Sequence, residues 1–143
     1  MAGPQSQSYH IPVFSNEATL GSELTCWDEV PELIDGVRMR LEIPDLTFET
    51  TSANGYFYAL SEIRAKLEAK ALLIGCYGGS KNVYPSPMIV AMGHGEKAYK
   101  LTLGKPARSA DLVNIFDVSD EVVPSTIKAQ REFYESWLKS LTR

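Results

Sequence analysis

The sequence predicts a single α+β domain in which a small, mostly antiparallel sheet packs against two main helices. Apolar residues alternate over several short segments, as they do in half-buried strands. Two longer segments, 54–70 and 125–141, instead place apolar residues three or four positions apart, as in amphipathic helices. The resulting order of strand, strand, helix, strand, strand and helix fits one α+β domain with three to five strands, and 143 residues suffice for one compact core.

The N-terminal part of the chain offers mixed signals. Residues 1–8 are small and polar and are predicted to be disordered, so the folded domain is expected to span 9–143. The stretch YHIPVF can start a strand, although Pro12 confines that strand to an edge or to a strand end. Residues 29–34 suggest a short helix, which Gly36 would end.

Residues 37–52 carry the clearest strand pattern. The stretch VRMRLEI places apolar residues at every second position, and these are Val37, Met39, Leu41 and Ile43. After Pro44 and Asp45 the stretch LTFETT alternates again, with Leu46 and Phe48 expected to face inward. The two segments predict either a hairpin or one bent strand.

A helical period replaces the alternation from Asn54 to Lys70. The apolar residues on one side of this segment are Tyr56, Leu60, Ile63 and Leu67. Ser52 or Asn54 is the expected cap. The apolar run at 71–78 then predicts a short buried strand.

The last third of the chain is expected to add a strand and two helical segments. Residues 97–104 alternate loosely and predict a strand, and residues 109–116 suggest a short helix capped by Ser109. The final helix is expected to start at Pro124 or Ser125. Its apolar stripe consists of Ile127, Phe133, Trp137 and Leu141.

Charge is distributed unevenly between the two ends of the chain. The net charge is −4, but residues 1–50 have a balance of −7 and residues 51–143 a balance of +3. An acidic surface repels nucleic acid and attracts basic partners. No apolar run approaches the roughly 20 residues that a membrane-spanning helix needs, and the N-terminus has no signal-peptide pattern, so we expect a cytoplasmic protein without membrane contact.

The stretch ALLIGCYGGSKNVYPSPM, residues 71–88, raises the question of catalysis. It lacks the Gly-Lys-Ser/Thr order of a phosphate loop, and its two prolines oppose a following helix. Cys76 could act as a nucleophile with His94 as base, although a cysteine after an apolar run is typically a small core residue. No metal-ligand spacing is present. The sequence thus predicts no cofactor, no metal and no catalytic residue.

The same stretch also fits a turn that presents side chains to a partner. Gly78 and Gly79 permit a sharp reversal through positive φ angles. Tyr77, Tyr84 and Met88 are the large side chains that such a loop would expose, and residues of these types are enriched at protein interfaces. The alternative is that they fold back onto the sheet.

Several short motifs resemble a family of small bacterial immunity proteins. They are Gly75-Cys-Tyr-Gly-Gly-Ser-Lys-Asn-Val-Tyr-Pro-Ser-x-Met, Met92-Gly-x-Gly, Ala98-Tyr, Gly104-Lys-Pro-Ala and Asp111-Leu-Val-x-Ile-Phe. The family comprises immunity partners of secreted polymorphic toxins, of the contact-dependent growth inhibition and Rhs type. The resemblance covers residues 60–141 and implies a protein that neutralises a cognate toxin domain by binding it, so it supplies no catalytic residues.

The acidic first third of the chain would suit a basic partner such as a nuclease toxin. Glu29, Glu32 and Asp35 are spaced by three, so on a helix they would share one face. Together with the neighbouring Asp28 they would form a compact negative patch. Our leading hypothesis is therefore an immunity protein. The rival hypotheses are a small hydrolase or transferase that uses Cys76 and His94, and a regulatory ligand-binding module.

Overall fold

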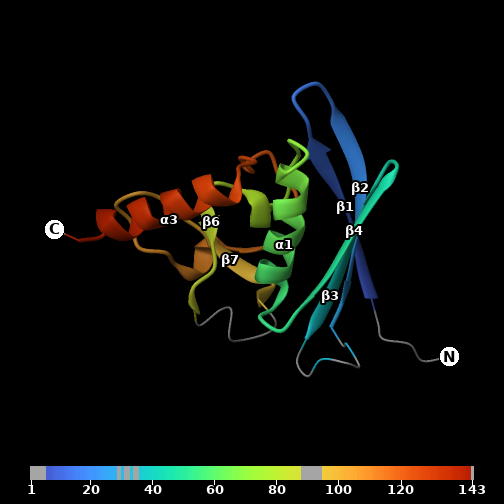
Figure 1. Ribbon diagram of the computed structural model, residues 1–143. Coiled ribbons are helices and arrows are strands. Elements are labelled where there is room, and N and C mark those ends of the chain that lie inside the picture. The colour runs from blue at the N-terminus through green and yellow to red at the C-terminus, as the bar shows by residue number, and fades with distance from the viewer. Residues whose placement is uncertain (1–5, 29, 31–32, 34–35, 88–94, 143) are drawn as a thin grey trace.

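The computed structural model describes residues 6–28, 30, 33, 36–87 and 95–142. These residues form a five-stranded sheet, a three-stranded sheet and two α-helices, which confirms the predicted α+β class (Figure 1). Every strand pairing is antiparallel, in the orders β4-β3-β2-β1-β5 and β6-β7-β8. The strands are β1 (Ser6–Phe14), β2 (Thr19–Trp27), β3 (Val37–Ile43), β4 (Leu46–Ser52), β5 (Leu73–Ile74), β6 (Val83–Tyr84), β7 (Lys97–Lys100) and β8 (Leu112–Asn114). The helices are α1 (Tyr56–Glu68) and α3 (Ile127–Ser140).

The alternating segment at 37–52 forms a hairpin, one of the two forms that the sequence left open. Strands β3 and β4 pair along their whole length, from Val37 opposite Ser52 to Ile43 opposite Leu46. The reversal needs a left-handed residue, and Asp45 supplies it with a φ of 67°. The predicted inward residues of β3 are buried, whereas Leu46 of β4 is 37% exposed, so its predicted inward position is wrong.

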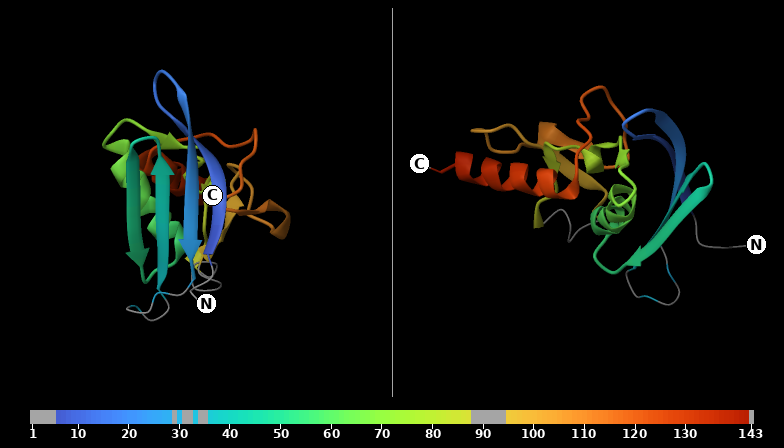
Figure 2. Two further views of the ribbon diagram at one scale, coloured as in Figure 1. Left: turned by 90° about the vertical axis from the view of Figure 1, so that its right-hand side faces the viewer. Right: turned by 45° about the horizontal axis from the view of Figure 1, so that its top comes forward.

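Helix α1 covers one face of the five-stranded sheet. Its four predicted core residues, Tyr56, Leu60, Ile63 and Leu67, are all buried. None of the described helices lies on the other face, which is open to solvent (Figure 2). The core of this half thus lies between α1 and the inner side chains of the strands.

Helix α3 does not pack on the five-stranded sheet, although the sequence predicted two helices on one sheet. It runs away from that sheet beside β6 (Figure 1), and Gln130 is its only buried residue. Its predicted apolar stripe is only partly covered, and Leu141, the last member of that stripe, follows the end of the helix and is 38% exposed. The helix is capped by Thr126, whose hydroxyl accepts a hydrogen bond from the Ala129 amide, rather than by Pro124 or Ser125.

Buried polar side chains attach α3 to the rest of the molecule. The Gln130 amide donates to the carbonyl oxygens of Gly78, Ser80 and Val83 at 2.9–3.0 Å. The guanidinium of Arg64, on α1, donates to Gln130 Oε1 at 2.7 Å and to the carbonyls of Gly78 and Ser125. We call Arg64, Gln130 and the loop carbonyls that they bind the polar hub.

The glycine pair at 78–79 serves close packing and not a positive φ angle. The glycines with positive φ in the described chain are Gly55, Gly95 and Gly104. A Cβ at Gly78 would lie 2.5 Å from Leu60 Cδ2, and a Cβ at Gly79 would lie 2.7 Å from Ile74 Cγ2. The loop therefore passes too close to the core for any side chain, which corrects the predicted reason for these glycines.

Two predictions for the first 36 residues require correction. Residues 6–8 belong to β1 and pair with Trp27, Cys26 and Thr25, so the disordered segment cannot extend to residue 8. Sequence alternation also failed to indicate β2, whose nine residues include Gly21 and several small polar side chains. Pairing with β1 and β3 on both sides makes up for this weak local pattern.

The helix predicted at 29–34 lies mostly outside the described residues. The two residues described there, Val30 and Leu33, form an antiparallel bridge in which the Leu33 amide donates to the Val30 carbonyl at 3.0 Å. The Gly36 amide in turn donates to the Leu33 carbonyl at 3.1 Å.

Element boundaries differ from the predictions at four other places. Helix α1 is preceded by Gly55 without a side-chain cap, because the Ser52 hydroxyl accepts from the Asn54 amide instead. The strand expected at 71–78 shrinks to β5, and that at 97–104 ends at Lys100. The helix expected at 109–116 is a 3₁₀ turn at Ser109–Asp111 followed by β8.

Candidate partner-binding site

A cluster of tyrosines and carboxylates surrounds Asp28 at the end of β2. The Tyr56 hydroxyl, at the start of α1, donates a hydrogen bond to Asp28 Oδ1. Phe116 joins this tyrosine to Tyr9 of β1, with ring centroids 4.8 Å from Tyr9 and 5.6 Å from Tyr56. The end of β2, the start of α1 and the chain after β8 therefore meet at one place.

Negative charge concentrates in this cluster. Burial raises the pKa of the Tyr9 hydroxyl, and the negative charges of Glu96, Asp117 and Asp28 raise it further. The pKa of Tyr56 is also raised, by burial first and then by its hydrogen bond to Asp28. Both tyrosines are neutral near neutral pH. The carboxylates of Asp28 and Glu96 raise the pKa of both, and that of Asp117 raises the pKa of Tyr9. We call Asp28, Glu96 and Asp117 the acidic cluster.

Only one member of the acidic cluster was predicted from the sequence. Asp28 was assigned with Glu29, Glu32 and Asp35, and these three lie outside the described residues. Glu96 and Asp117 were missed because they are about 70 to 90 positions away in the chain and sit in segments without a helical or strand pattern. The pairing of β1 with β2, the packing of Phe116 on Tyr9 and the hydrogen bond from the Ile115 amide to the Glu96 carbonyl bring them together.

Tyr77 is not the exposed loop residue that the sequence suggested. Its side chain is 8% exposed and belongs to the core, so the alternative of folding back onto the protein holds for it. Its hydroxyl reaches the surface, where it donates to Glu121 Oε1 at 3.1 Å. The backbone explains the burial, because the Tyr77 and Gly78 amides donate to the carbonyls of Asp117 and Ile115.

Tyr84 lies in a row of aromatic side chains at the surface. Its ring stacks on Tyr134 of α3 with centroids 4.2 Å apart and planes 16° apart, and Trp137 follows at 6.1 Å from Tyr134. On its other side Tyr84 meets the edge of Phe57 on α1 at 5.3 Å. We call Tyr84, Tyr134 and Trp137 the aromatic row.

The aromatic row is held in a fixed arrangement. Each of the three side chains is partly exposed. The Trp137 indole donates to the Lys105 carbonyl at 2.8 Å, and Arg131 Nη1 lies 3.4 Å from the Tyr84 hydroxyl. The sequence indicated Trp137 as a core residue, and nothing in the spacing of Tyr134 distinguished it from its neighbours. Met88, the other predicted loop contact, lies outside the described residues.

The two cysteines are buried and protonated. Burial raises the pKa of Cys26, and Glu96 and Asp28 raise it further. Burial raises the pKa of Cys76 to about 11, against the opposing effects of a backbone hydrogen bond from Gly79 and the nearby Arg64. A thiol with such a pKa is not the thiolate that nucleophilic catalysis uses. His94, the base considered for Cys76, lies outside the described residues.

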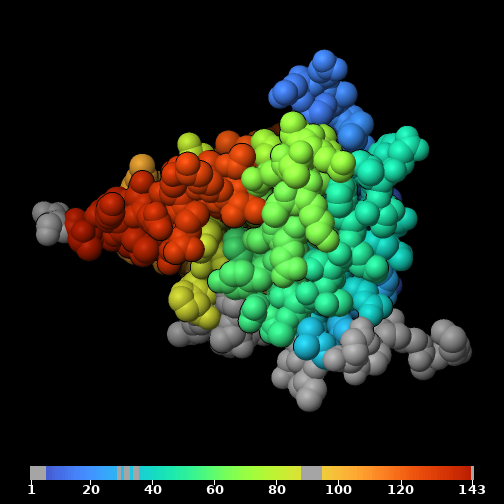
Figure 3. Space-filling view, in the orientation of Figure 1, coloured from blue at the N-terminus to red at the C-terminus, as the bar shows by residue number. Residues whose placement is uncertain are grey.

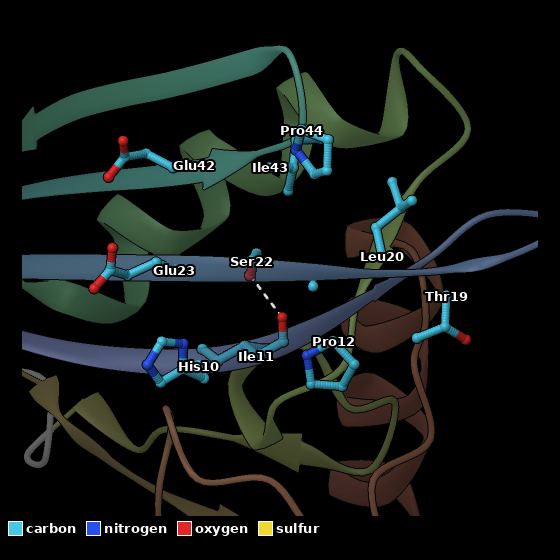
Figure 4. Close-up of a pocket in the computed structure, with 11 residues that line it drawn as sticks. His10, Ile11, Pro12, Thr19, Leu20, Ser22, Glu23, Glu42, Ile43 and Pro44 are labelled. Atoms are coloured by element: carbon cyan, nitrogen blue, oxygen red, sulfur yellow. Dashed lines mark hydrogen bonds between the residues drawn. The ribbon is translucent and has the colours of Figure 1, made fainter.

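A shallow hollow of about 520 Å³ lies on the open face of the larger sheet. Figure 4 shows His10, Glu23 and Glu42 side by side on neighbouring strands at its rim, with Pro12, Leu20 and Pro44 on the other side. Glu23 lies directly opposite both His10 and Glu42 in the strand registers. No group of three or more His, Cys, Asp or Glu side chains in the described parts of the chain is arranged to hold a metal ion.

No protein-family model matches this sequence, and no curated protein matches it. None of the described helices has the length and apolar character that crossing a membrane requires.

Proposed function

We propose that this protein is an immunity protein that binds a cognate secreted bacterial toxin domain and blocks its active site or substrate path. The toxin domain is basic, as nuclease domains are. The observation that carries the proposal is the acidic cluster, because three carboxylates from distant parts of the chain all lie near enough to Tyr9 to raise its pKa, and Asp28 accepts a hydrogen bond from Tyr56. The resemblance of residues 60–141 to toxin immunity proteins supports the same reading.

The acidic cluster and the aromatic row would have different tasks in such a complex. Exposed carboxylates attract a basic partner over several ångströms and raise the rate of encounter. Partly exposed tyrosine and tryptophan side chains bury large areas at little entropic cost and slow dissociation. Because its rings already stack on one another, the aromatic row would lose little conformational freedom when a partner covers it.

The first test is the interaction itself. The protein is co-expressed with the toxin domain encoded beside its gene, and the complex is purified through a tag on the toxin. We expect the two chains to co-purify and the toxin-producing cells to grow only when this protein is present. A co-encoded protein that neither binds nor harms the cells would contradict the proposal.

The second test concerns steering by the acidic cluster. Asp117→Lys reverses a charge on an exposed side chain, so at low salt we expect the association rate to fall about three- to tenfold. The defect should shrink as salt rises, because the Debye length falls to about 8 Å at physiological ionic strength. Glu17→Lys is the matched control, since it makes the same change in the β1–β2 turn, at the other end of that hairpin from Asp28. Equal rates for Asp117→Lys and Glu17→Lys at low salt would remove the steering role.

A further inference from the structure

Strand β4 forms a free margin of the five-stranded sheet. It pairs with β3 on one side, and on its other side no described strand follows (Figure 2). Figure 3 shows the same margin, with no described segment over it, next to α1. An edge of seven residues is long for an unpaired strand and offers a template for a further strand.

The register tells which backbone groups are available at this edge. The hairpin turn consists of Pro44 and Asp45, so Ile43 and Leu46 form the hydrogen-bonded pair that closes it. The N–H and C=O groups of every second residue from Leu46 therefore point to β3. Those of Thr47, Glu49 and Thr51 point outward. The Lys66 ammonium, which lies 3.2 Å from the Glu49 carbonyl, already uses one of these outward acceptors.

Helix α1 runs beside the edge and presents one ridge to it. Tyr58, Glu62 and Lys66 are spaced by four, so they share one side of the helix. Glu62 accepts a hydrogen bond from the Thr50 hydroxyl, and Lys66 reaches Glu49, which fixes this ridge next to β4. Tyr58 is 42% exposed, one turn before Glu62. A strand added to β4 would have this ridge along its inner side.

The charge of Glu49, at the centre of β4, determines which kind of strand can pair with this edge. Glu49 lies opposite Arg40 in the register, but Arg40 is engaged elsewhere, 3.6 Å from Glu42 and 5.2 Å from the centre of the Trp27 ring. Glu49 has no ion pair with any residue that the structure describes. Its carboxylate is thus left to face whatever residue a further strand places beside it.

A second copy of the chain is a poor occupant of this edge. Two β4 strands that pair antiparallel about their centre would place Glu49 directly opposite its own counterpart. Like charges at directly opposed positions destabilise a strand pair. A strand with a Lys or Arg at this position would instead place opposite charges across from each other, which stabilises the strand pair.

We propose that the outward edge of β4 binds an extended strand of the partner protein, which pairs with Thr47, Glu49 and Thr51 and places a Lys or Arg side chain opposite Glu49. The inference rests on the proposed function in that it takes the partner to be the basic toxin domain. The added strand would displace Lys66 from the Glu49 carbonyl and make a six-stranded sheet.

The experiment uses two blocked seven-residue peptides and does not need the toxin. One is Thr-Val-Thr-Lys-Thr-Val-Thr, and the other has Glu in place of Lys. Each is titrated into the isotope-labelled protein while amide chemical shifts are followed by NMR. For the Lys peptide we expect shifts centred on Thr47, Glu49 and Thr51, and binding about fivefold tighter than for the Glu peptide. The Glu49→Lys variant should reverse the preference.

A backbone variant tests the pairing itself. Thr51→Pro removes an outward N–H while leaving the bonds to β3, and edge strands tolerate proline. It should weaken binding of the Lys peptide about fivefold, whereas Thr51→Val, which keeps the N–H, should not. If Thr51→Pro fails to fold, the charge reversal at Glu49 still decides the matter.

Three outcomes would overturn this inference. They are equal binding of both peptides to wild type and to Glu49→Lys, shifts centred away from β4, and self-association of the chain through β4 without any peptide. Because the peptides replace the toxin, failure here leaves the proposed function to its co-purification test. Conversely, a co-encoded protein that does not co-purify would end the immunity proposal without changing the peptide result.

Discussion

The two halves of this molecule are held together by different chemistry. The five-stranded sheet and α1 meet through apolar side chains, and Val37, Met39 and Leu41 are fully buried between them. Helix α3 attaches through the polar hub, where Arg64 and Gln130 bind loop carbonyls, and through the stacking of Tyr134 on Tyr84. Among the described residues, six of the eight large exposed apolar side chains lie beyond residue 100, so the second half has buried less of its apolar surface.

The difference indicates where the molecule opens first. Apolar burial stabilises by an amount that grows with area and depends little on geometry. A buried polar network contributes only while every partner is in place, and an unsatisfied buried group costs about 1–3 kcal/mol. We therefore expect α3 to separate from the hub as a unit before the larger sheet unfolds.

The largest expected effect comes from breaking the hub at Gln130. Gln130→Leu keeps the size of the side chain but removes the donor to three carbonyls and the acceptor for Arg64. We expect the free energy of opening of α3 to fall by roughly 3–5 kcal/mol. Hydrogen exchange should show this as lost protection in α3, with β2 and β3 nearly unchanged.

Two further variants complete this measurement. Glu132→Leu introduces the same side chain at an exposed position of α3 and should leave exchange there unchanged. Leu41→Ala makes a cavity in the apolar half and should cost about 3 kcal/mol in global unfolding, which appears in both halves. Equal loss of protection in the sheet and in α3 for Gln130→Leu would show that the halves unfold together.

A smaller effect is expected at residues 78–80, where the loop whose carbonyls belong to the polar hub passes over the apolar core. A Cβ at Gly79 would meet Ile74 Cγ2 at 2.7 Å and the Ile74 carbonyl oxygen at 2.9 Å. That oxygen cannot move freely, since β5 pairs with β1. Gly79→Ala should therefore lower the free energy of unfolding by about 1–3 kcal/mol in urea titrations.

The matched control for this prediction is Gly21→Ala in β2. A Cβ there would have no atom within 4 Å, so we expect a change within about 0.5 kcal/mol. A Gly79→Ala protein as stable as wild type would show that the loop can move away from Ile74, and the two halves would then be less closely fitted than the structure indicates.

The apolar half was largely predictable from the sequence, and the hub was not. Alternation at 37–43 and helical spacing at 56–67 identify residues that are all buried, because one periodic face meets one core. Gln130 sits on a helix whose apolar stripe suggested other core positions. Its partners are backbone carbonyls of a loop, and a sequence does not indicate where carbonyls point.

The candidate site was predicted only in part for a similar physical reason. Asp28 was found because acids near it form a local pattern, whereas Glu96 and Asp117 join it only through tertiary packing. Tyr84 was found because prolines and glycines marked its loop. The stacking of Tyr134 on Tyr84 depends on the direction in which α3 leaves the hub, and the spacing within α3 does not contain that information.

The smallest expected effect concerns a contact at the surface that depends on pH. There Glu121 connects Tyr77 to Lys100 of β7 in the smaller sheet. Glu121 accepts hydrogen bonds from Lys100 at 3.0 Å and from the Tyr77 hydroxyl at 3.1 Å. These two contacts, that of Lys100 first, lower the pKa of the Glu121 carboxyl below its ordinary value of 4.5.

Stability from a lowered pKa is present above the ordinary value and is lost as the pH falls through the folded-state value. Glu121→Gln keeps an acceptor for Tyr77 without the charge, so the advantage of wild type over the variant should be smaller at about pH 3 than at about pH 7. The measurement is the urea midpoint of both proteins at both pH values, with Asp120→Asn as the control for an exposed neighbouring carboxylate. Because the Glu121 side chain is exposed, the difference should shrink further in high salt. A difference between wild type and Glu121→Gln that persists unchanged at about pH 3 would mean that packing, and not the charge, connects this loop to β7.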